Sequence, residues 1–216
     1  MYKSGEIMRL SEVKNIVSEP TTILDIGAHT GQFYHWAKNV WPTSTIWMIE
    51  ANDVHEDTLR NLTMYSDDNY VIATLGDTER DVKFYTRSDK PYTEGASYYK
   101  EANYWDIPHL VLEIPKRLKR LDELFESDSY FQLVKLDTQG SELDILRGGE
   151  NLCKKAEVII LEVSYVEHNE EAPLAEEAIE FMKDYGYSNH IEIGEHYSPE
   201  PQWKDIIVQK DLCFYK

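Results

Sequence analysis

Basic charge, cysteine and long apolar runs are all scarce in this sequence. The chain has 216 residues with 40 acidic and 22 basic side chains, for a formal net charge of −18. That charge repels a phosphate backbone, so we expect no nucleic-acid partner. Cys153 and Cys213 are too few for a disulfide framework and have no zinc-ligand spacing, which favours a reducing cytoplasm. No apolar run reaches the ~20 residues of a membrane span, and the first residues lack the apolar region of a signal peptide, so no membrane association is expected.

Two common nucleotide-binding motifs are also missing. A Gly-x-Gly-x-x-Gly turn that began at Gly27 would need glycine at positions 29 and 32, but these are His29 and Gln32. The pyrophosphate of a dinucleotide is therefore poorly accommodated, and an NAD-dependent enzyme is the least favoured function. No Walker-type Gly-x-x-x-x-Gly-Lys-Ser/Thr motif occurs, which disfavours a nucleoside triphosphate.

What the sequence does contain is a strand-like apolar run at 22–26 that ends in Gly27-x-x-x-Gly31. Glycine has no Cβ, so such a turn lets bare backbone approach a ligand. A second apolar run ends at Glu50, at the spacing where a nucleotide-binding βαβ unit places its ribose-hydroxyl acceptor. The pattern indicates a small adenosine ligand that ends in an amino acid, namely S-adenosylmethionine. The alternative is an ordinary turn with a surface glutamate.

The rest of the chain alternates between strand and helix patterns. We expect one domain over 1–216, with an N-terminal helix within 1–20 and a parallel sheet with right-handed crossovers. Asp53 is the expected N-cap of one helix. The expected strands are 23–26, 45–49, 70–75, 82–85, 131–136, 157–163, 189–193 and 211–215, and the expected helices are 33–40, 53–62, 121–125, one that ends at 148–149, and 174–185.

One long stretch breaks this alternation. Residues 86–115 are polar, rich in tyrosine and without a clear period. An irregular segment of this length inside a domain is usually functional or disordered, and its tyrosines argue against simple disorder. We therefore expect a substrate loop or lid there.

Five motifs together resemble the FkbM family of S-adenosylmethionine-dependent methyltransferases, most of whose members modify hydroxyl groups. The resemblance implies a Rossmann-like class I methyltransferase fold of the α/β class. Its mostly parallel seven-stranded sheet has the order 3-2-1-4-5-7-6, with the last strand antiparallel and helices on both faces. The cofactor lies over the carboxyl ends of the strands. The motifs are LDIGAHTG at 24–31, IEAN at 49–52, GASY at 95–98, KLDTQGSELDILRG at 135–148 and LEV at 161–163.

Three positions depart from the family pattern. Asparagine is usual where His29 stands, proline where Ala51 stands, and an acidic residue where Gln139 stands. The first two changes leave backbone contacts with the cofactor possible. The third removes a carboxylate, so a base role for that position is in doubt here.

The resemblance also implies roles for cofactor-binding residues. The glycine turn would meet the methionine part, Glu50 would accept the ribose hydroxyls, and Asp77 could bond the adenine amine. Asp25 or Asp137 could face the methionine ammonium, although Asp25 could instead be a buried structural acceptor. The full predicted set is Asp25, Gly27, Ala28, His29, Thr30, Gly31, Glu50, Ala51, Asn52, Gly76, Asp77 and Asp137.

Methyl transfer to a hydroxyl needs an aligned acceptor and a general base. Asp137 and Glu142 are the preferred pair, because both lie where the fourth strand meets the next helix. Glu142 could alternatively be a first-turn carboxylate that the helix dipole favours. His168 and His196, both expected in loops, are the further candidate bases. No metal is predicted, because Asp137 alone does not provide several converging oxygen ligands.

The favoured function is O-methylation of a hydroxyl on a sugar or another small metabolite. N-methylation of an amine is the alternative enzymatic function, since it relaxes the need for a strong base. A cofactor-binding module without catalysis is the non-enzymatic alternative, suggested by the change at Gln139. The sequence does not identify the acceptor, because substrate choice resides in irregular loops.

Overall fold

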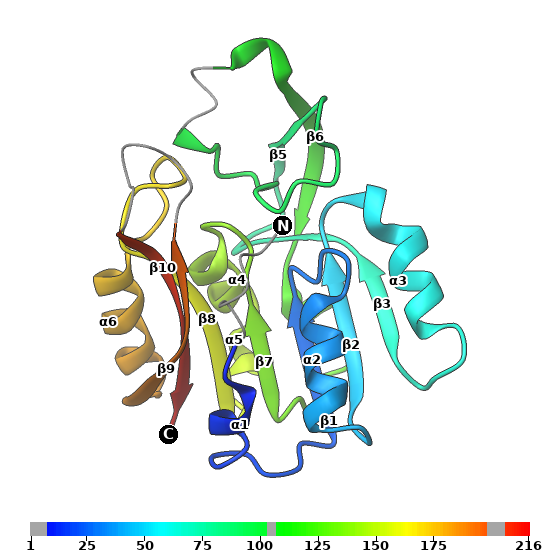
Figure 1. Cartoon of the computed structure of the whole chain (residues 1–216), viewed down its shortest axis with the longest axis vertical. Coiled ribbons are helices and arrows are strands. Elements are labelled where there is room, and N and C mark those ends of the chain that lie inside the picture. Colours follow the sequence, from blue (N-terminus) through cyan, green and yellow to red (C-terminus); the bar gives the residue numbers. More distant parts are fainter. Residues whose placement is uncertain (1–7, 103–106, 198–205) are drawn as a thin grey trace.

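The computed structural model describes residues 8–102, 107–197 and 206–216, and a seven-stranded sheet lies at its centre (Figure 1). The strands lie in the order β3-β2-β1-β7-β8-β10-β9. Counted along the chain within this sheet, the order is 3-2-1-4-5-7-6, which confirms the expected fold class. β10 alone runs antiparallel to both of its neighbours. The strands are β1 (Thr22–Ile26), β2 (Thr45–Glu50), β3 (Asn69–Ile72), β7 (Leu133–Leu136), β8 (Val158–Ser164), β9 (Asn189–Tyr197) and β10 (Ile207–Tyr215).

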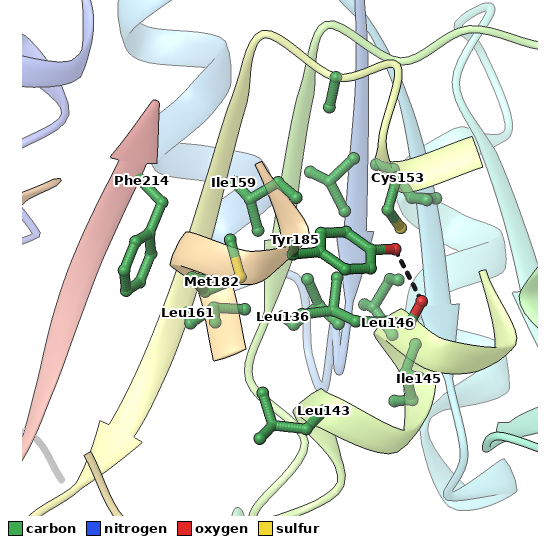
Figure 2. Packing of buried hydrophobic residues seen from close by; sticks show 14 of the residues in the cluster. Leu136, Leu143, Ile145, Leu146, Cys153, Ile159, Leu161, Met182, Tyr185 and Phe214 are labelled. Atoms are coloured by element: carbon green, nitrogen blue, oxygen red, sulfur yellow. Dashed lines mark hydrogen bonds between the residues drawn. The ribbon is translucent and has the colours of Figure 1, made fainter. Parts of the chain in front are cut away.

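Helices cover both faces of this sheet. On one face α1 (Leu10–Val13), α2 (Gln32–Val40) and α3 (Glu56–Thr63) bury apolar side chains against the strands. On the other face α4 (Glu142–Gly148), α5 (Glu150–Cys153) and α6 (Ala175–Tyr185) form a second core. Figure 2 shows this second core, in which the Tyr185 hydroxyl donates to the Leu146 carbonyl at 2.7 Å. α6 ends at Gly186, whose φ of +108° suits glycine at a helix end, as the sequence predicted.

A smaller three-stranded sheet lies beyond the carboxyl ends of the central strands (Figure 1). It has the order β4-β6-β5, with β4 (Thr74–Leu75), β5 (Asp81–Arg87) and β6 (Val111–Lys119). Residues 86–87 belong to β5 and residues 111–115 belong to β6, which pairs with β5 in an antiparallel manner. The expectation that 86–115 is irregular throughout was therefore wrong at both ends. The expected strand at 70–75 is likewise divided between the two sheets.

Several local expectations also need correction. The N-terminal helix spans only α1 among the described residues, and a 3-10 helix η1 (Asp53–His55) precedes α3. The N-cap there is Asn52 rather than Asp53, because the Asn52 side chain accepts from the Val54 amide. β9 continues through His196 and Tyr197, so His196 lies in a strand and not in a loop. The remaining short elements are η3 (Pro108–Leu110) and η4 (Leu121–Glu123).

Among the helices in the described part of the chain, none combines the length and the apolar character that crossing a membrane requires.

Candidate functional site

A cavity of about 570 Å³ lies at the carboxyl ends of the central strands. Its walls include residues at the ends of β1, β2 and β7, together with β8, β9 and β10. Residues between Lys90 and Glu101, within the predicted substrate loop, line it from the opposite side. Ligand sites in proteins commonly have this size and this position in open α/β sheets. The cavity is therefore the candidate site.

The turn after β1 depends on glycine at position 27. Gly27 has a φ of +79°, and a Cβ added there would lie 1.8 Å from the Asp137 carbonyl oxygen. Only glycine therefore allows the ends of β1 and β7 to touch. The Gly27 and Ala28 amides donate to the Ile49 carbonyl at 2.9 and 3.1 Å, which fixes the turn against the end of β2. Both residues line the cavity, where Gly27 has no side chain and Ala28 only a methyl group, so they form a cradle close to the backbone.

Glu50 ends β2 and lines the same cavity. Its Oε2 accepts from the His29 amide at 2.8 Å, and its Oε1 accepts from the Asn52 amide at 2.6 Å. Burial raises the pKa of Glu50, although these amides oppose the shift. Each carboxylate oxygen can accept more than one hydrogen bond, so the group keeps acceptor capacity toward a ligand. Glu50 thus fits an acceptor of ribose hydroxyls.

His29 forms the wall between Glu50 and the loop over the cavity. It has a φ of +50°, its Nε2 lies 3.1 Å from the Tyr92 carbonyl, and its ring contacts the buried His55 ring at 4.2 Å between centroids. Burial lowers the pKa of His55 to about 4, so His55 is a neutral packing group at neutral pH. His29 and Ala51 both line the cavity, as predicted for residues beside a cofactor.

Six predicted cofactor residues do not line the cavity. Gly31 begins α2, and a Cβ there would lie 2.4 Å from Leu62, so this glycine is needed for packing. After β3 the chain leaves the central sheet, which carries Asp77 away to pair with Arg80 at 3.5 Å. The structure thus gives no support for contact between Asp77 and an adenine amine. The six residues are Asp25, Thr30, Gly31, Asn52, Gly76 and Asp77.

Lys135 is buried in β7 between two carboxylates. Its Nζ lies 3.0 Å from Asp137 Oδ2 and 3.7 Å from Asp25 Oδ1. Burial raises the pKa of Asp25 to about 6 despite Lys135, whereas for Asp137 the Lys135 ammonium outweighs burial and lowers the pKa. Asp25 is fully buried, and neither of its oxygens accepts a hydrogen bond from the described residues. It does not line the cavity, so its burial fits the structural alternative, although none of the described residues donates to it as an acceptor role would require. Asp137 does reach the cavity.

Gln139 connects Asp137 with Glu162. Its Nε2 donates to Asp137 Oδ1 at 3.1 Å and to Glu162 Oε2 at 2.7 Å, and Gln209 Nε2 donates to the same Glu162 oxygen at 2.9 Å. Burial and the nearby Asp137 charge raise the pKa of Glu162 well above its ordinary value. An acidic residue at position 139 would face two carboxylates, so the amide here separates like charges.

His196 and Asp211 complete the far side of the cavity. His196 Nε2 lies 2.9 Å from Asp211 Oδ2 and 3.7 Å from Glu162 Oε1. Burial would lower the pKa of His196, but the two carboxylates outweigh it and raise the pKa to about 9. Ligand atoms of these three residues lie within 4.8 Å of one another, a spacing that would also suit a divalent cation. The described geometry is a hydrogen-bonded cluster, and the predicted absence of a metal stays a prediction.

The structure places the other two candidate bases differently. Glu142 does not line the cavity, because its carboxylate accepts from the Thr138 amide at 2.7 Å and the Gly140 amide at 3.1 Å. Those bonds close the loop before α4, so the first-turn structural alternative fits its placement better than a base role. His168 lines the cavity near the segment 88–102, and its carbonyl accepts from the Ala102 amide at 2.8 Å.

Lys135, Glu162 and Asp211 were given no role from the sequence. Each is a buried or half-buried ionisable residue inside a strand, and the strands of Lys135 and Glu162 are otherwise nearly all apolar. Burying such a charge is costly unless it is paired. A charged residue in a buried strand therefore indicates that an opposite charge lies close to it in the fold. The pattern would have pointed to one charged cluster where β7, β8 and β10 lie side by side.

Comparison with known proteins identifies the class and then the family. A family model described as "Methyltransferase FkbM domain" matches residues 25–188. No curated protein sequence matches the chain. The fold and the match define an S-adenosylmethionine-dependent methyltransferase, and the chain belongs to the FkbM methyltransferase family.

Solved structures show the same fold at low sequence identity. The N-terminal domain of EvdMO1, solved in the presence of SAH and D-fucose, is 10% identical with a TM-score of 0.52, over 96% of this chain and 81% of that chain. TehB from Haemophilus influenzae is 9% identical with a TM-score of 0.53, over 96% of this chain and 61% of that chain. A TehB-like SAM-dependent methyltransferase from Corynebacterium glutamicum is 9% identical with a TM-score of 0.50, over 99% of this chain and 90% of that chain.

Proposed function

We propose that this protein transfers the methyl group of S-adenosylmethionine to a hydroxyl of a sugar or another small hydroxylated metabolite. One observation carries the proposal. A single cavity joins the Gly27 turn and Glu50 at one side with Asp137, His196 and Asp211 at the other. The first side suits a donor that contains an amino acid and a ribose, and the second offers proton acceptors to an alcohol.

The donor side of the cavity consists of the turn after β1 and the Glu50 carboxylate. The cradle at Gly27 and Ala28 leaves room for the methionine part close to backbone. Glu50 remains an acceptor for both ribose hydroxyls while two backbone amides hold its carboxylate in place. Such a fixed carboxylate is preorganised, so it binds without reordering its own side chain.

The acceptor side of the cavity has to hold and deprotonate an alcohol. Displacement at a sulfonium carbon needs the nucleophile held in line, and a hydroxyl oxygen must also lose its proton. The cavity provides polar side chains for holding a polyhydroxylated ligand, among them Thr138, Gln139 and Gln209. The D-fucose present with EvdMO1 supports a sugar as one acceptor class to test, although that likeness concerns the fold.

An amine acceptor is the second candidate, and the charge of the site favours it. Six acidic side chains, among them Asp137, Glu162 and Asp211, line the cavity against two lysines, Lys90 and Lys135. Such an excess of carboxylates would attract a cationic ammonium group. The net charge of the chain, −18, supports a small-molecule acceptor rather than nucleic acid.

The donor half of the proposal is tested by titration calorimetry with S-adenosylmethionine. Wild type should bind it, and Glu50→Gln should bind at least ~10-fold more weakly, because hydrogen bonds to a charged group contribute roughly 1.5–3 kcal/mol. Glu56→Gln is the matched control, since Glu56 is a solvent-facing glutamate that pairs with Arg60. Absence of binding by wild type would refute the proposed function.

The acceptor half is tested with methyl-labelled donor and two panels, one of sugars and polyols and one of amines. Label on oxygen of a hydroxyl acceptor supports the proposal. Label on nitrogen alone would replace it with N-methylation. Tight donor binding without transfer to either panel would favour the non-catalytic alternative.

A further inference from the structure

We propose that His196 is the general base of the methyl transfer and that Asp211 is the residue that positions it. This inference rests on the proposed O-methyltransferase function, because a hydroxyl acceptor has the stronger need for a base. It assigns a role to residues of the strand pair β9 and β10, which lies beyond the family match over residues 25–188.

The imidazole ring of His196 is fixed by a hydrogen bond to Asp211. His196 projects from β9 and Asp211 from β10, with Nε2 and Oδ2 2.9 Å apart. Asp211 is almost fully buried, so its carboxylate has little freedom to turn away. Both side chains line the cavity. A buried carboxylate that bonds one ring nitrogen fixes the ring and leaves the other nitrogen for chemistry.

The fold makes specific room for this carboxylate. A Cβ added at Gly194, opposite Asp211 in the strand pair, would lie 2.1 Å from Asp211 Oδ2. The strand register also shifts between Asp211 and Leu212, which marks an irregularity at this point. Irregular strand pairs often re-aim a side chain beside an active site. Glycine and bulge together allow Asp211 to reach His196.

The remaining ring nitrogen is free for the acceptor. Among the residues that the structure describes, no hydrogen bond involves His196 Nδ1. In the proposed step Nδ1 takes the hydroxyl proton while the acceptor oxygen forms its bond to the methyl carbon. The bond from that carbon to sulfur breaks, and its electron pair goes to sulfur. The products are a methyl ether, a neutral thioether and an imidazolium, and the imidazolium then releases its proton to water.

The charges that face His196 determine when it can act. Asp211 lies on β10, Glu162 on β8, and Asp137 follows β7, whose Lys135 carries the opposing charge. The carboxylates hold His196 as an imidazolium at neutral pH, because its pKa is raised to about 9. A sulfonium charge in the cavity would repel this imidazolium and lower its pKa. Donor binding would thereby convert His196 toward the form that accepts a proton.

The test compares two probes that differ in that one charge, S-adenosylmethionine and S-adenosylhomocysteine. Histidine is labelled with ¹³C, and the His196 signal, assigned with His196→Asn, is followed by NMR from pH 6 to 10 in each complex. We expect a midpoint at least about one pH unit lower with the sulfonium, the size expected for a unit charge within ~8 Å. The ¹³C chemical shift of His190, at the opposite end of β9, should be the same in both complexes at each pH.

Variants separate positioning from a merely structural role. Asp211→Asn should lower the His196 midpoint and reduce kcat at least ~10-fold with little change in KM, because the carboxylate that orients the ring is lost. Gly194→Ala should act in the same direction by displacing Asp211. Glu192 lies on β9, as His196 does, and is a half-exposed partner of Lys210 on β10. Glu192→Gln should leave both the His196 midpoint and kcat unchanged. The thermal midpoint of each variant shows whether it is folded.

Each result has one consequence. If both probes bind and the His196 midpoint is the same with each, His196 does not face the sulfonium and the base assignment is overturned, while the proposed function stands. If neither probe binds, the proposed function fails instead. Methyl transfer that EDTA abolishes and Mg²⁺ restores would assign the cluster to a metal and overturn the inference. A lowered midpoint, with kcat lost in Asp211→Asn, supports it.

Discussion

The buried Asp25 carboxylate gives the protein a stability that should depend on pH in a defined way. Asp25 lies in the central strand β1 without a hydrogen bond from any described residue, and Lys135 at 3.7 Å only partly offsets its burial. Asp25→Asn keeps the shape of the side chain and removes its titration. The Lys135 pair with Asp137 at 3.0 Å remains in the variant.

The sign and size follow from the pKa. Asp25 has a pKa of about 6 in the fold, against 3.8 ordinarily. The folded state therefore binds the proton more tightly than the unfolded chain, so this group favours folding fully below about pH 3.8 and loses that contribution as pH rises through about 6. At ~1.4 kcal/mol for each pKa unit, the full loss is about 3 kcal/mol, of which roughly 2 kcal/mol falls between pH 4 and 7.

The assay is urea unfolding of wild type and Asp25→Asn at several pH values without cofactor, followed by tryptophan fluorescence. The variant minus wild-type free energy of unfolding should rise by roughly 2 kcal/mol from pH 4 to 7, whatever its constant offset. Asp128→Asn makes the same chemical change at an exposed site and serves as the control. A difference for Asp25→Asn that is flat with pH, or that falls, would refute the reasoning.

Three further substitutions test the site. Gly27→Ala should destabilise the fold by at least ~2 kcal/mol and abolish donor binding, measured by thermal unfolding and calorimetry, because it adds a strained φ and an overlap with the Asp137 carbonyl. Gln139→Glu should destabilise by roughly 2–4 kcal/mol at pH 8 and less at pH 5, in urea unfolding, because a third carboxylate joins Asp137 and Glu162. Tyr99→Phe removes a 2.9 Å hydrogen bond to an α4 carboxylate, so hydrogen exchange should quicken in 88–102, by roughly 5-fold for a loss of ~1 kcal/mol.

The parts of the fold that the sequence predicted well depend on local signals. The Gly27 turn, the strand ending at Glu50 and the helix ending at Gly186 each have their determinant within a few residues. Alternation of strands and helices then restricts the topology, since crossovers are right-handed and neighbouring strands pair. The alternation predicted a parallel sheet with right-handed crossovers, and the order of its strands was expected from the resemblance alone.

The parts that were missed depend on pairings distant in sequence. β6 is a strand because β5 provides an antiparallel partner, and nothing within 111–119 alternates strongly enough to indicate this. β4, which joins the smaller sheet, lines the cavity with Thr74 and Leu75, but Asp77, two residues beyond β4, does not line it. His196 was expected in a loop because β9 continues past its last strongly apolar residue, Ile193, through pairing with β10.

The change at Gln139 follows from the charge of the same cluster. Four carboxylates, Asp25, Asp137, Glu162 and Asp211, share two cations, Lys135 and His196. A fifth carboxylate at position 139 would have no cation of its own, and an unpaired buried charge is strongly destabilising. An amide at this position instead donates to two of the carboxylates already there. Gln139 thus adds hydrogen bonds to this cluster without adding a further negative charge to it.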